Sequence, residues 1–330
     1  MVASYPVARG RRLRSTEWLR QLVAETRLSV RDLIWPLFVR SSQTEPEIKG
    51  MPGVRRLTLD ELPAAMRQAQ AWGIPAVALF PTIDPDKRTD EGEEATNPQN
   101  LICQALKCAR AESSQIGLIA DVALDPFTSH GHDGVIRHNQ VANEASLEIL
   151  CAQAVVQAQA GADILAPSDM MDGRVGAIRK ALDAANLTDK LILSYAAKYA
   201  SAFYGPYRAA LKAPPLTVGP SDKKTYQMDP ANSDEAMREI AQDLNEGADM
   251  VMVKPALLYL DIIYRVVQHF AVPTMAFHVS GEYAMIHAAQ QQGWLSGDKA
   301  MLESLLSIKR AGATAIFTYA VPAIIPQLST

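Results

Sequence analysis

The stretch EGADMVMVKP, residues 246–255, contains the pattern that decides the fold of this chain. A glycine closes a helix-like segment, an apolar run follows without polar alternation, and Lys254 stands at the end of that run. Such a run is typical of a strand buried on both faces, as in parallel sheets. A lysine that ends a buried strand lies where its amine can be desolvated.

Seven further runs of this kind occur along the chain. They are LIWPLFV (33–39), AVALF (76–80), GLIADVAL (117–124), ADILAPS (162–168), LILSYAAK (191–198), PTMAFHVS (273–280) and TAIFTYA (314–320). Amphipathic segments such as 146–162 and 234–248 separate them, and Gly161 and Gly247 are predicted to cap these helices. Eight strand-then-helix units predict an α/β fold, a (β/α)8 TIM barrel. The alternative is a doubly wound open sheet, which is disfavoured because no GxGxxG follows the first strand.

Composition excludes several classes of function. The 330 residues carry 32 basic and 36 acidic side chains, and the only basic cluster is RGRRLR at 9–14, so we expect no nucleic-acid partner. The sequence shows no membrane-length apolar run and no signal-peptide core, so we expect no membrane partner. Cys103, Cys108 and Cys151 lack CxxC spacing and indicate a reducing compartment. We expect a cytoplasmic protein, or one of the plastid stroma if a transit peptide has been removed.

Active sites of such barrels lie at the carboxyl ends of the strands. Polar residues gather there in six of the runs: Asp121, Asp125, Ser168, Asp169, Lys198, Lys254, His278, Ser280 and Tyr319. Burial and a second nearby cation both lower a lysine pKa, so a close pair of lysines supplies a neutral amine that attacks a ketone. The alternative is that each lysine only extends its ammonium to water. Convergence of so many strand ends favours the catalytic interpretation.

Two connecting segments are also rich in functional groups. DPFTSHGHDG (125–134) carries two aspartates and two histidines, which suit metal binding or acid–base chemistry, or else a set of hydrogen-bonded turns. After the fifth strand, Arg208, Lys223, Lys224 and Gln227 fall on a loop of roughly thirty residues, which is long for a barrel and typical of a lid. These side chains are suited to clamp a substrate carboxylate, although solvated surface charge is the alternative.

A set of longer motifs resembles one known family. The motifs are RRLR (11–14), MPGV (51–54), ADVALDPFTSHGHDG (120–134), APSDMMDGRVGAIR (166–179), SYAAKYASAFYGPYR (194–208), KKTYQMDPANSDEA (223–236), EGADMVMVKP (246–255), FHVSGEYAM (277–285) and FTYA (317–320). In this order the chain resembles the porphobilinogen synthase (5-aminolevulinate dehydratase) family. The resemblance implies a hydro-lyase that condenses two 5-aminolevulinate molecules to porphobilinogen, with loss of two waters, in haem and chlorophyll (tetrapyrrole) biosynthesis.

The resemblance also implies roles for individual residues. Lys254 is expected to form the Schiff base with the substrate that becomes the propionate side, and Lys198 to bind the second substrate as an imine or as a cation. Asp125 and Asp133 are expected to position the substrate amino group or to move protons. The expected substrate-binding residues are Ser280 and Tyr319 for the first carboxylate, Arg208, Lys223 and Gln227 for the second, and Phe203, Tyr204 and Ser168 along the pocket.

Metal use divides this family. Its zinc-dependent members carry three cysteines where this chain has Ala123, Asp125 and Asp133, so the resemblance implies the cysteine-poor, Mg²⁺-stimulated type without catalytic zinc. Glu239 stands where that type carries a glutamate for an allosteric Mg²⁺, so we expect it to be a metal ligand. The alternative is a solvated glutamate on an exposed helix face.

Several expectations concern regions outside the motifs. Residues 1–30 are expected to form an N-terminal oligomerisation arm of a homo-octamer, and residues 31–330 the catalytic TIM-barrel domain. Ala256 replaces the glycine usual in the family and would be strained if its backbone φ were positive. Two alternative functions remain: a class I aldolase-type lyase with a single Schiff-base lysine, and a non-catalytic paralogue.

Overall fold

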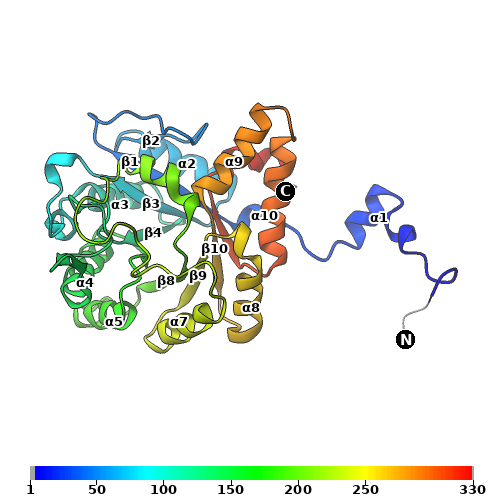
Figure 1. The fold of residues 1–330 in the computed structure, drawn as a ribbon. Helices are drawn as coiled ribbons and strands as arrows, with labels where there is room; N and C mark the ends of the chain where they lie inside the picture. Colours follow the sequence, from blue (N-terminus) through cyan, green and yellow to red (C-terminus); the bar gives the residue numbers. More distant parts are fainter. Residues whose placement is uncertain (1–3, 329–330) are drawn as a thin grey trace.

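A closed barrel of parallel strands forms the centre of the molecule (Figure 1). The computed structural model describes residues 4–328. The barrel strands are β1 (Leu33–Arg40), β3 (Ala76–Thr82), β4 (Gly117–Val122), β7 (Ile164–Pro167), β8 (Leu191–Lys198), β9 (Met250–Lys254), β10 (Thr274–His278) and β11 (Ala315–Thr318). The first and last strands close the ring, because Leu33 pairs with Ile316 and Ile34 with Phe317. The predicted barrel is confirmed, and each of the eight predicted runs overlaps one of its strands, although β1 and β3 extend past the predicted ends to Arg40 and Thr82.

Helices surround the barrel and alternate with its strands. They are α2 (Leu62–Trp72), α3 (Leu101–Glu112), α4 (Asn143–Gln159), α5 (Arg174–Ala184), α7 (Asp234–Asn245), α8 (Leu260–Phe270), α9 (Ser280–Gln291) and α10 (Gly297–Arg310), with the short α6 (Gly205–Ala210) and α11 (Val321–Ile324). Shorter strands are β2 (Arg56–Leu57), β5 (Ile136–Arg137) and β6 (Gln140–Val141). Gly161 and Gly247 follow α4 and α7 with φ of 116° and 106°, a conformation that favours glycine at a helix end.

Aromatic side chains fill the barrel interior. Phe277 stacks on Phe317 with ring centroids 5.2 Å apart, and Phe38 lies 5.9 Å from Phe80. All four rings are fully buried. Aromatic packing of this kind stabilises a core beyond the area it buries. These rings exclude water from the barrel interior below the strand ends, so a side chain placed there is desolvated.

A buried ion pair joins the helix layer to the barrel. Arg174 of α5 contacts the carboxylate of Asp243 of α7 at 3.1 Å, and Ser194 of β8 donates to the same carboxylate. Arg174 and Asp243 are both almost completely buried. A charge in such a place destabilises the fold strongly once its partner is removed.

We therefore expect Asp243→Ala to lower the free energy of unfolding by about 3–5 kcal/mol, because it leaves the buried Arg174 guanidinium with the longer contact to Asp169 at 3.9 Å. Chemical denaturation measures this change. The matched control is Asp183→Ala, which breaks a surface pair with Arg179 in which the Asp183 side chain is 50% exposed. That variant should lose no more than about 1 kcal/mol. Equal losses in the two variants would contradict the assignment of the buried pair.

The N-terminal segment leaves the barrel (Figure 1). It contains the 3₁₀ helix η1 (Gly10–Arg14) and α1 (Glu17–Leu22), and α1 lies well away from the barrel helices. Residues 1–3 of the predicted arm lie outside the described residues. Trp18 and Leu22 are 64% and 67% exposed, and exposed apolar side chains of this size often mark a contact surface. Within residues 4–328 no helix is both long and apolar enough to cross a membrane.

Candidate active site

A cavity of about 630 Å³ opens at the carboxyl ends of the barrel strands. Lys198 and Lys254 reach it from the last positions of β8 and β9, which are neighbouring strands. Eight of the residues predicted to form the site line this cavity: Asp125, Ser168, Lys198, Tyr204, Arg208, Lys223, Gln227 and Lys254. Residues that are far apart in the sequence therefore share one site, at the end of the barrel where its active site was predicted.

Aromatic rings enclose the amine of Lys254. Its Nζ lies 4.5 Å from the ring centroid of Phe277, 4.9 Å from that of Tyr207, 5.0 Å from that of Tyr195 and 5.4 Å from that of Tyr204. Burial, followed by the positive charge of Lys198, lowers the pKa of Lys254 to about 7. A large fraction of this amine is therefore neutral near pH 7, which is the form that attacks a carbonyl.

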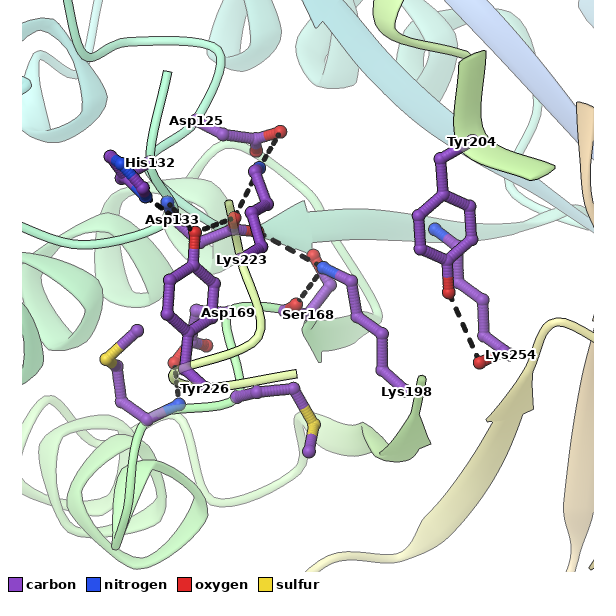
Figure 2. A network of polar contacts seen from close by, with 12 residues as sticks. Asp125, His132, Asp133, Ser168, Asp169, Lys198, Tyr204, Lys223, Tyr226 and Lys254 are labelled. Carbon is purple, nitrogen blue, oxygen red and sulfur yellow. Dashed lines mark hydrogen bonds and ion pairs between the residues drawn. The ribbon is translucent and has the colours of Figure 1, made fainter. Parts of the chain in front are cut away.

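Lys198 has a different environment (Figure 2). Its Nζ lies 3.1 Å from the carboxylate of Asp133 and also donates to the carbonyl oxygen of Ser168. Lys223 contacts the same carboxylate at 2.5 Å and that of Asp125 at 3.4 Å. Burial alone would raise the pKa of Asp133, but the charges of Lys198 and Lys223 outweigh burial and hold it well below its usual value. One lysine is thus paired with a carboxylate, while the other is enclosed by rings.

The segment 125–134 is fixed by hydrogen bonds to the segment that carries Lys223 (Figure 2). The hydroxyl of Tyr226 donates to Asp133 at 3.1 Å and lies 3.1 Å from Nδ1 of His132. The other ring nitrogen of His132 contacts the carbonyl oxygen of Pro220 at 3.0 Å. These contacts hold the segment 125–134 against the segment 220–226. No group of three or more His, Cys, Asp or Glu side chains suited to a metal ion occurs within the described part of the chain.

Besides Asp133, three predicted residues of the site do not line the cavity. The Ser280 hydroxyl accepts the backbone N–H of Tyr207 at 2.9 Å and donates to the carbonyl oxygen of Phe203. Tyr319 is almost fully buried, and its ring centroid is 5.9 Å from that of Phe277, one of the rings around Lys254. Ser280, Tyr319 and Phe203 therefore support the first layer of the site without lining the cavity.

The segment after Lys198 is partly helical, which corrects the prediction that Arg208 lies on a loop. The 3₁₀ helix η5 (Ala202–Tyr204) leads into α6, which contains Arg208. Pro206 stands in the first turn of α6, where a missing backbone N–H costs no hydrogen bond. Lys223 and Gln227 follow after an irregular stretch, as predicted.

Ala256 was predicted to be strained if its backbone φ were positive, and its φ is negative. Its φ is −102° and its ψ is −55°, in the region that any L-residue adopts. Alanine is therefore compatible with the backbone at this position. The difference from the family's usual glycine carries no conformational cost here.

Glu239 does not line the first cavity. It lines a second cavity of about 310 Å³. Asp172 and Glu235 line the same cavity. Burial raises the pKa of Glu239, and neighbouring acidic groups add to this effect. Gln227 lines both cavities, so it lies at the boundary between them. Glu239 is half-buried, which disfavours the alternative of a solvated helix face.

Some residues of the site were not predicted to belong to it. Tyr195 and Tyr207 face Lys254, and Tyr226 holds Asp133. Tyr207 and Tyr226 each adjoin a predicted residue in the sequence, which was the available signal. Asp121 was noted at its strand end without a role; burial, followed by the charge of Asp125, raises its pKa. One of its oxygens is buried and has no hydrogen-bond partner among residues 4–328.

Comparison with known proteins gives consistent matches. A family model described as delta-aminolevulinic acid dehydratase matches residues 7–326. A delta-aminolevulinic acid dehydratase of Bradyrhizobium diazoefficiens is 54% identical over 98% of this chain and 91% of its own length. A delta-aminolevulinic acid dehydratase of Rhodobacter capsulatus is 50% identical over 97% of this chain and 96% of its own length. The crystal structure of the Toxoplasma gondii enzyme in complex with its product porphobilinogen has a TM-score of 0.93 and 46% identity, over 97% of this chain and 91% of that one.

Proposed function

The chain belongs to the delta-aminolevulinic acid dehydratase family and is an enzyme of the lyase class, and from this premise we propose that Lys254 carries the reaction as a Schiff-base nucleophile. The observation that carries the proposal is the aromatic enclosure of the Lys254 amine beside a second lysine. A desolvated amine with a pKa near 7 combines nucleophilicity with a useful neutral fraction. A solvated lysine at pH 7 would be almost entirely protonated.

The proposed chemistry begins with the ketone of the first 5-aminolevulinate. The neutral amine of Lys254 attacks the ketone carbon, a carbon–nitrogen bond forms, and water leaves as the imine is completed. The imine withdraws electrons from the substrate and so assists the carbon–carbon and carbon–nitrogen bonds to the second molecule. A substrate amino group then replaces Lys254 on the imine carbon, so the bond to the lysine breaks and its amine is regenerated. The product is porphobilinogen, formed with the loss of two waters in all, and the pathway served is tetrapyrrole biosynthesis. The substrate on Lys254 becomes the propionate side.

Lys198 and its carboxylates are proposed to hold the second substrate. The contact of Lys198 with Asp133 supports a cationic role, in which the ammonium group stays paired with this carboxylate. Asp125 lines the cavity, and Asp133 contacts Lys198 and Lys223, which also line it, so both carboxyl groups are suited to position the substrate amino group or to move its protons. The proposed carboxylate clamp for this substrate consists of Arg208, Lys223 and Gln227, all on the cavity wall.

The first substrate is proposed to be held from the opposite side of Lys254. Ser280 and Tyr319 would bind its carboxylate once the site opens, since both are buried in this structure. Phe203, Tyr204 and Ser168 would border the substrate. Tyr204 is the best placed of these, since its hydroxyl donates to the carbonyl oxygens of Tyr199 and Lys254 and its ring faces the amine.

We assign the metal requirement to Mg²⁺ at Glu239, in an allosteric role. The second cavity offers the carboxylate of Glu239, a hard oxygen ligand that suits Mg²⁺ and not a thiophilic metal. Asp172 and Glu235 line the same cavity but do not form a direct three-ligand cluster with Glu239. Because Mg²⁺ retains several waters, one direct carboxylate ligand is enough. The cysteines of the chain lie on α3 and α4, away from the segment 125–134, which supports a reaction without catalytic zinc.

Porphobilinogen formation by chelator-treated protein tests both proposals. We expect Mg²⁺ to restore the rate and Zn²⁺ not to restore it. Glu239→Gln should keep the metal-free rate but lose at least about tenfold in Mg²⁺ affinity, since a direct ligand loses its charge. Glu148→Gln, an acidic-to-amide change on α4, is the control. Mg²⁺ stimulation that survives unchanged in Glu239→Gln would contradict this metal site, and no product under any condition would contradict the function.

We also propose that the chain assembles as a homo-octamer through its N-terminal arm. The exposed apolar side chains of Trp18 and Leu22 support this, because a partner subunit would cover them. The arginines of the segment 9–14 would then contact a neighbouring subunit, which accounts for the basic cluster without nucleic acid.

A further inference from the structure

The first turn of α9 contacts the two segments that border Lys254. This turn begins with Ser280, Gly281 and Glu282, immediately after β10. On one side it contacts the stretch that follows Lys254, and on the other it contacts η5 and α6. The turn is therefore placed to set the position of the reactive lysine relative to the segment that covers it.

Glu282 makes the contact to the lysine side. Its carboxylate accepts the backbone N–H of Leu257 at 2.8 Å, that of Leu258 at 3.4 Å and that of Val279 at 2.9 Å. The contact to Val279 caps its own helix, but the other two bridge to a different segment of the chain. Glu282 is fully buried, so water does not replace these bonds when they are lost.

Gly281 makes the contact to the covering segment. A Cβ built on this residue would lie 2.5 Å from the carbonyl oxygen of Phe203 and 2.6 Å from its Cα. Backbone therefore packs directly on backbone at this point. Phe203 begins the stretch that carries Tyr204 and Tyr207, two of the rings around Lys254. The first turn of α9 therefore contacts Leu257 through Glu282 and, through Gly281, packs against the segment that carries Tyr204 and Tyr207.

We propose that Glu282 is a positioning residue, whose carboxylate holds the stretch after Lys254 against α9 and so keeps the reactive amine inside its aromatic enclosure. The inference rests on the proposed role of Lys254. Loss of the acceptor leaves the N–H of Leu257 unpaired, and the stretch relaxes toward water. Lys254 then becomes better hydrated, its ammonium form is favoured, and imine formation slows.

The pH dependence of imine formation separates this role from a purely structural one. The charged groups that act on Lys254 are Lys198, Asp121, Asp125 and Asp133, and none of them is altered in a Glu282 variant. The tyrosines around the amine are neutral because burial keeps their pKa values high. Burial raises the pKa of Glu282 itself to about 7, so its own titration falls in the same pH range. Glu282→Gln removes that titration and Glu282→Asp keeps a carboxyl group, so a midpoint shifted in both variants reports hydration of Lys254. A loss of stability alone would leave the midpoint of the folded protein unchanged.

The test is the rate of borohydride-trapped adduct at Lys254 with 5-aminolevulinate, measured against pH for wild type, Glu282→Gln and Glu282→Asp. In both variants the rate of adduct formation should fall about 10- to 100-fold, and the midpoint of its pH dependence should lie at higher pH than in wild type. The aspartate keeps the charge at the helix start but is one methylene too short to reach Leu257, so it serves if the glutamine variant fails to fold. Glu61→Gln is the control, since Glu61 accepts the N–H of Thr58 at 2.8 Å ahead of α2; its rate and midpoint should match wild type.

A wild-type rate and midpoint in Glu282→Asp would overturn the inference. The absence of an adduct at Lys254 in the wild-type protein would instead overturn the proposed function, and this inference with it. The two failures are therefore distinguishable in one set of measurements.

Discussion

Replacing Lys254 by methionine is expected to lower kcat for porphobilinogen formation by about 10⁴-fold or more, because the nucleophile that forms the imine is removed. Methionine keeps the unbranched apolar stem among the rings of Tyr195, Tyr207 and Phe277, so the enclosure should remain packed. Steady-state kinetics with 5-aminolevulinate measures the loss. Lys180→Met, at an exposed position on α5, is the control and should retain wild-type activity.

The same lysine sets the acid limb of the pH profile. Since the pKa of Lys254 is about 7, its neutral fraction falls as the pH drops below 7. We expect kcat/KM to fall about tenfold for each pH unit below that limb. Substantial turnover by Lys254→Met, or a wild-type rate that stays flat from pH 7 to pH 5, would contradict the assignment of Lys254 as the nucleophile.

Asp133→Asn is expected to have the second largest effect, on both activity and stability. The carboxylate of Asp133 is the shared partner of Lys198 and Lys223, and it is almost completely buried. Its removal leaves two ammonium groups without full compensation, which should cost about 3–5 kcal/mol in the free energy of unfolding. We expect kcat to fall about 10²- to 10⁴-fold, because Lys198 loses its orientation and a group suited to proton transfer is lost.

Asp125→Asn provides the comparison. Among residues 4–328 Asp125 forms one ion pair, with Lys223 at 3.4 Å, so its loss should destabilise the protein less than the loss of Asp133. The pKa of Asp133 is depressed in the folded state, so its stabilising contribution is present above the ordinary aspartate pKa of about 3.9 and declines as the pH falls below it. Wild type and Asp133→Asn should therefore converge in stability at low pH. A constant difference down to pH 2 would contradict this ion-pair assignment.

The strands could be predicted from the sequence because their signal is local. A strand buried on both faces is mostly apolar, and each of the eight runs is mostly apolar with its functional polar residues gathered near its carboxyl end. The place of Lys198 and Lys254 also followed, since the carboxyl ends of the strands meet at one end of a barrel. Helix ends at Gly161 and Gly247 were predictable because a positive φ favours glycine.

Contacts between distant segments could not be predicted in the same way. Arg174 and Asp243 are 69 residues apart, and nothing in the local pattern of either pairs them. The rings around Lys254 come from β8, β10 and the segment after Lys198, so only the closed barrel brings them together. The unequal environments of the two lysines follow from Asp133, which reaches Lys198 from the other side of the cavity.

Mapping the lysine that forms the imine tests most directly whether Lys254 is the nucleophile. Wild-type protein is treated with 5-aminolevulinate and borohydride, digested, and mapped by mass spectrometry. The account predicts a reduced adduct on the peptide that contains Lys254, and its loss in Lys254→Met. Product formation without any adduct at Lys254, or with the adduct only on another lysine, would contradict it.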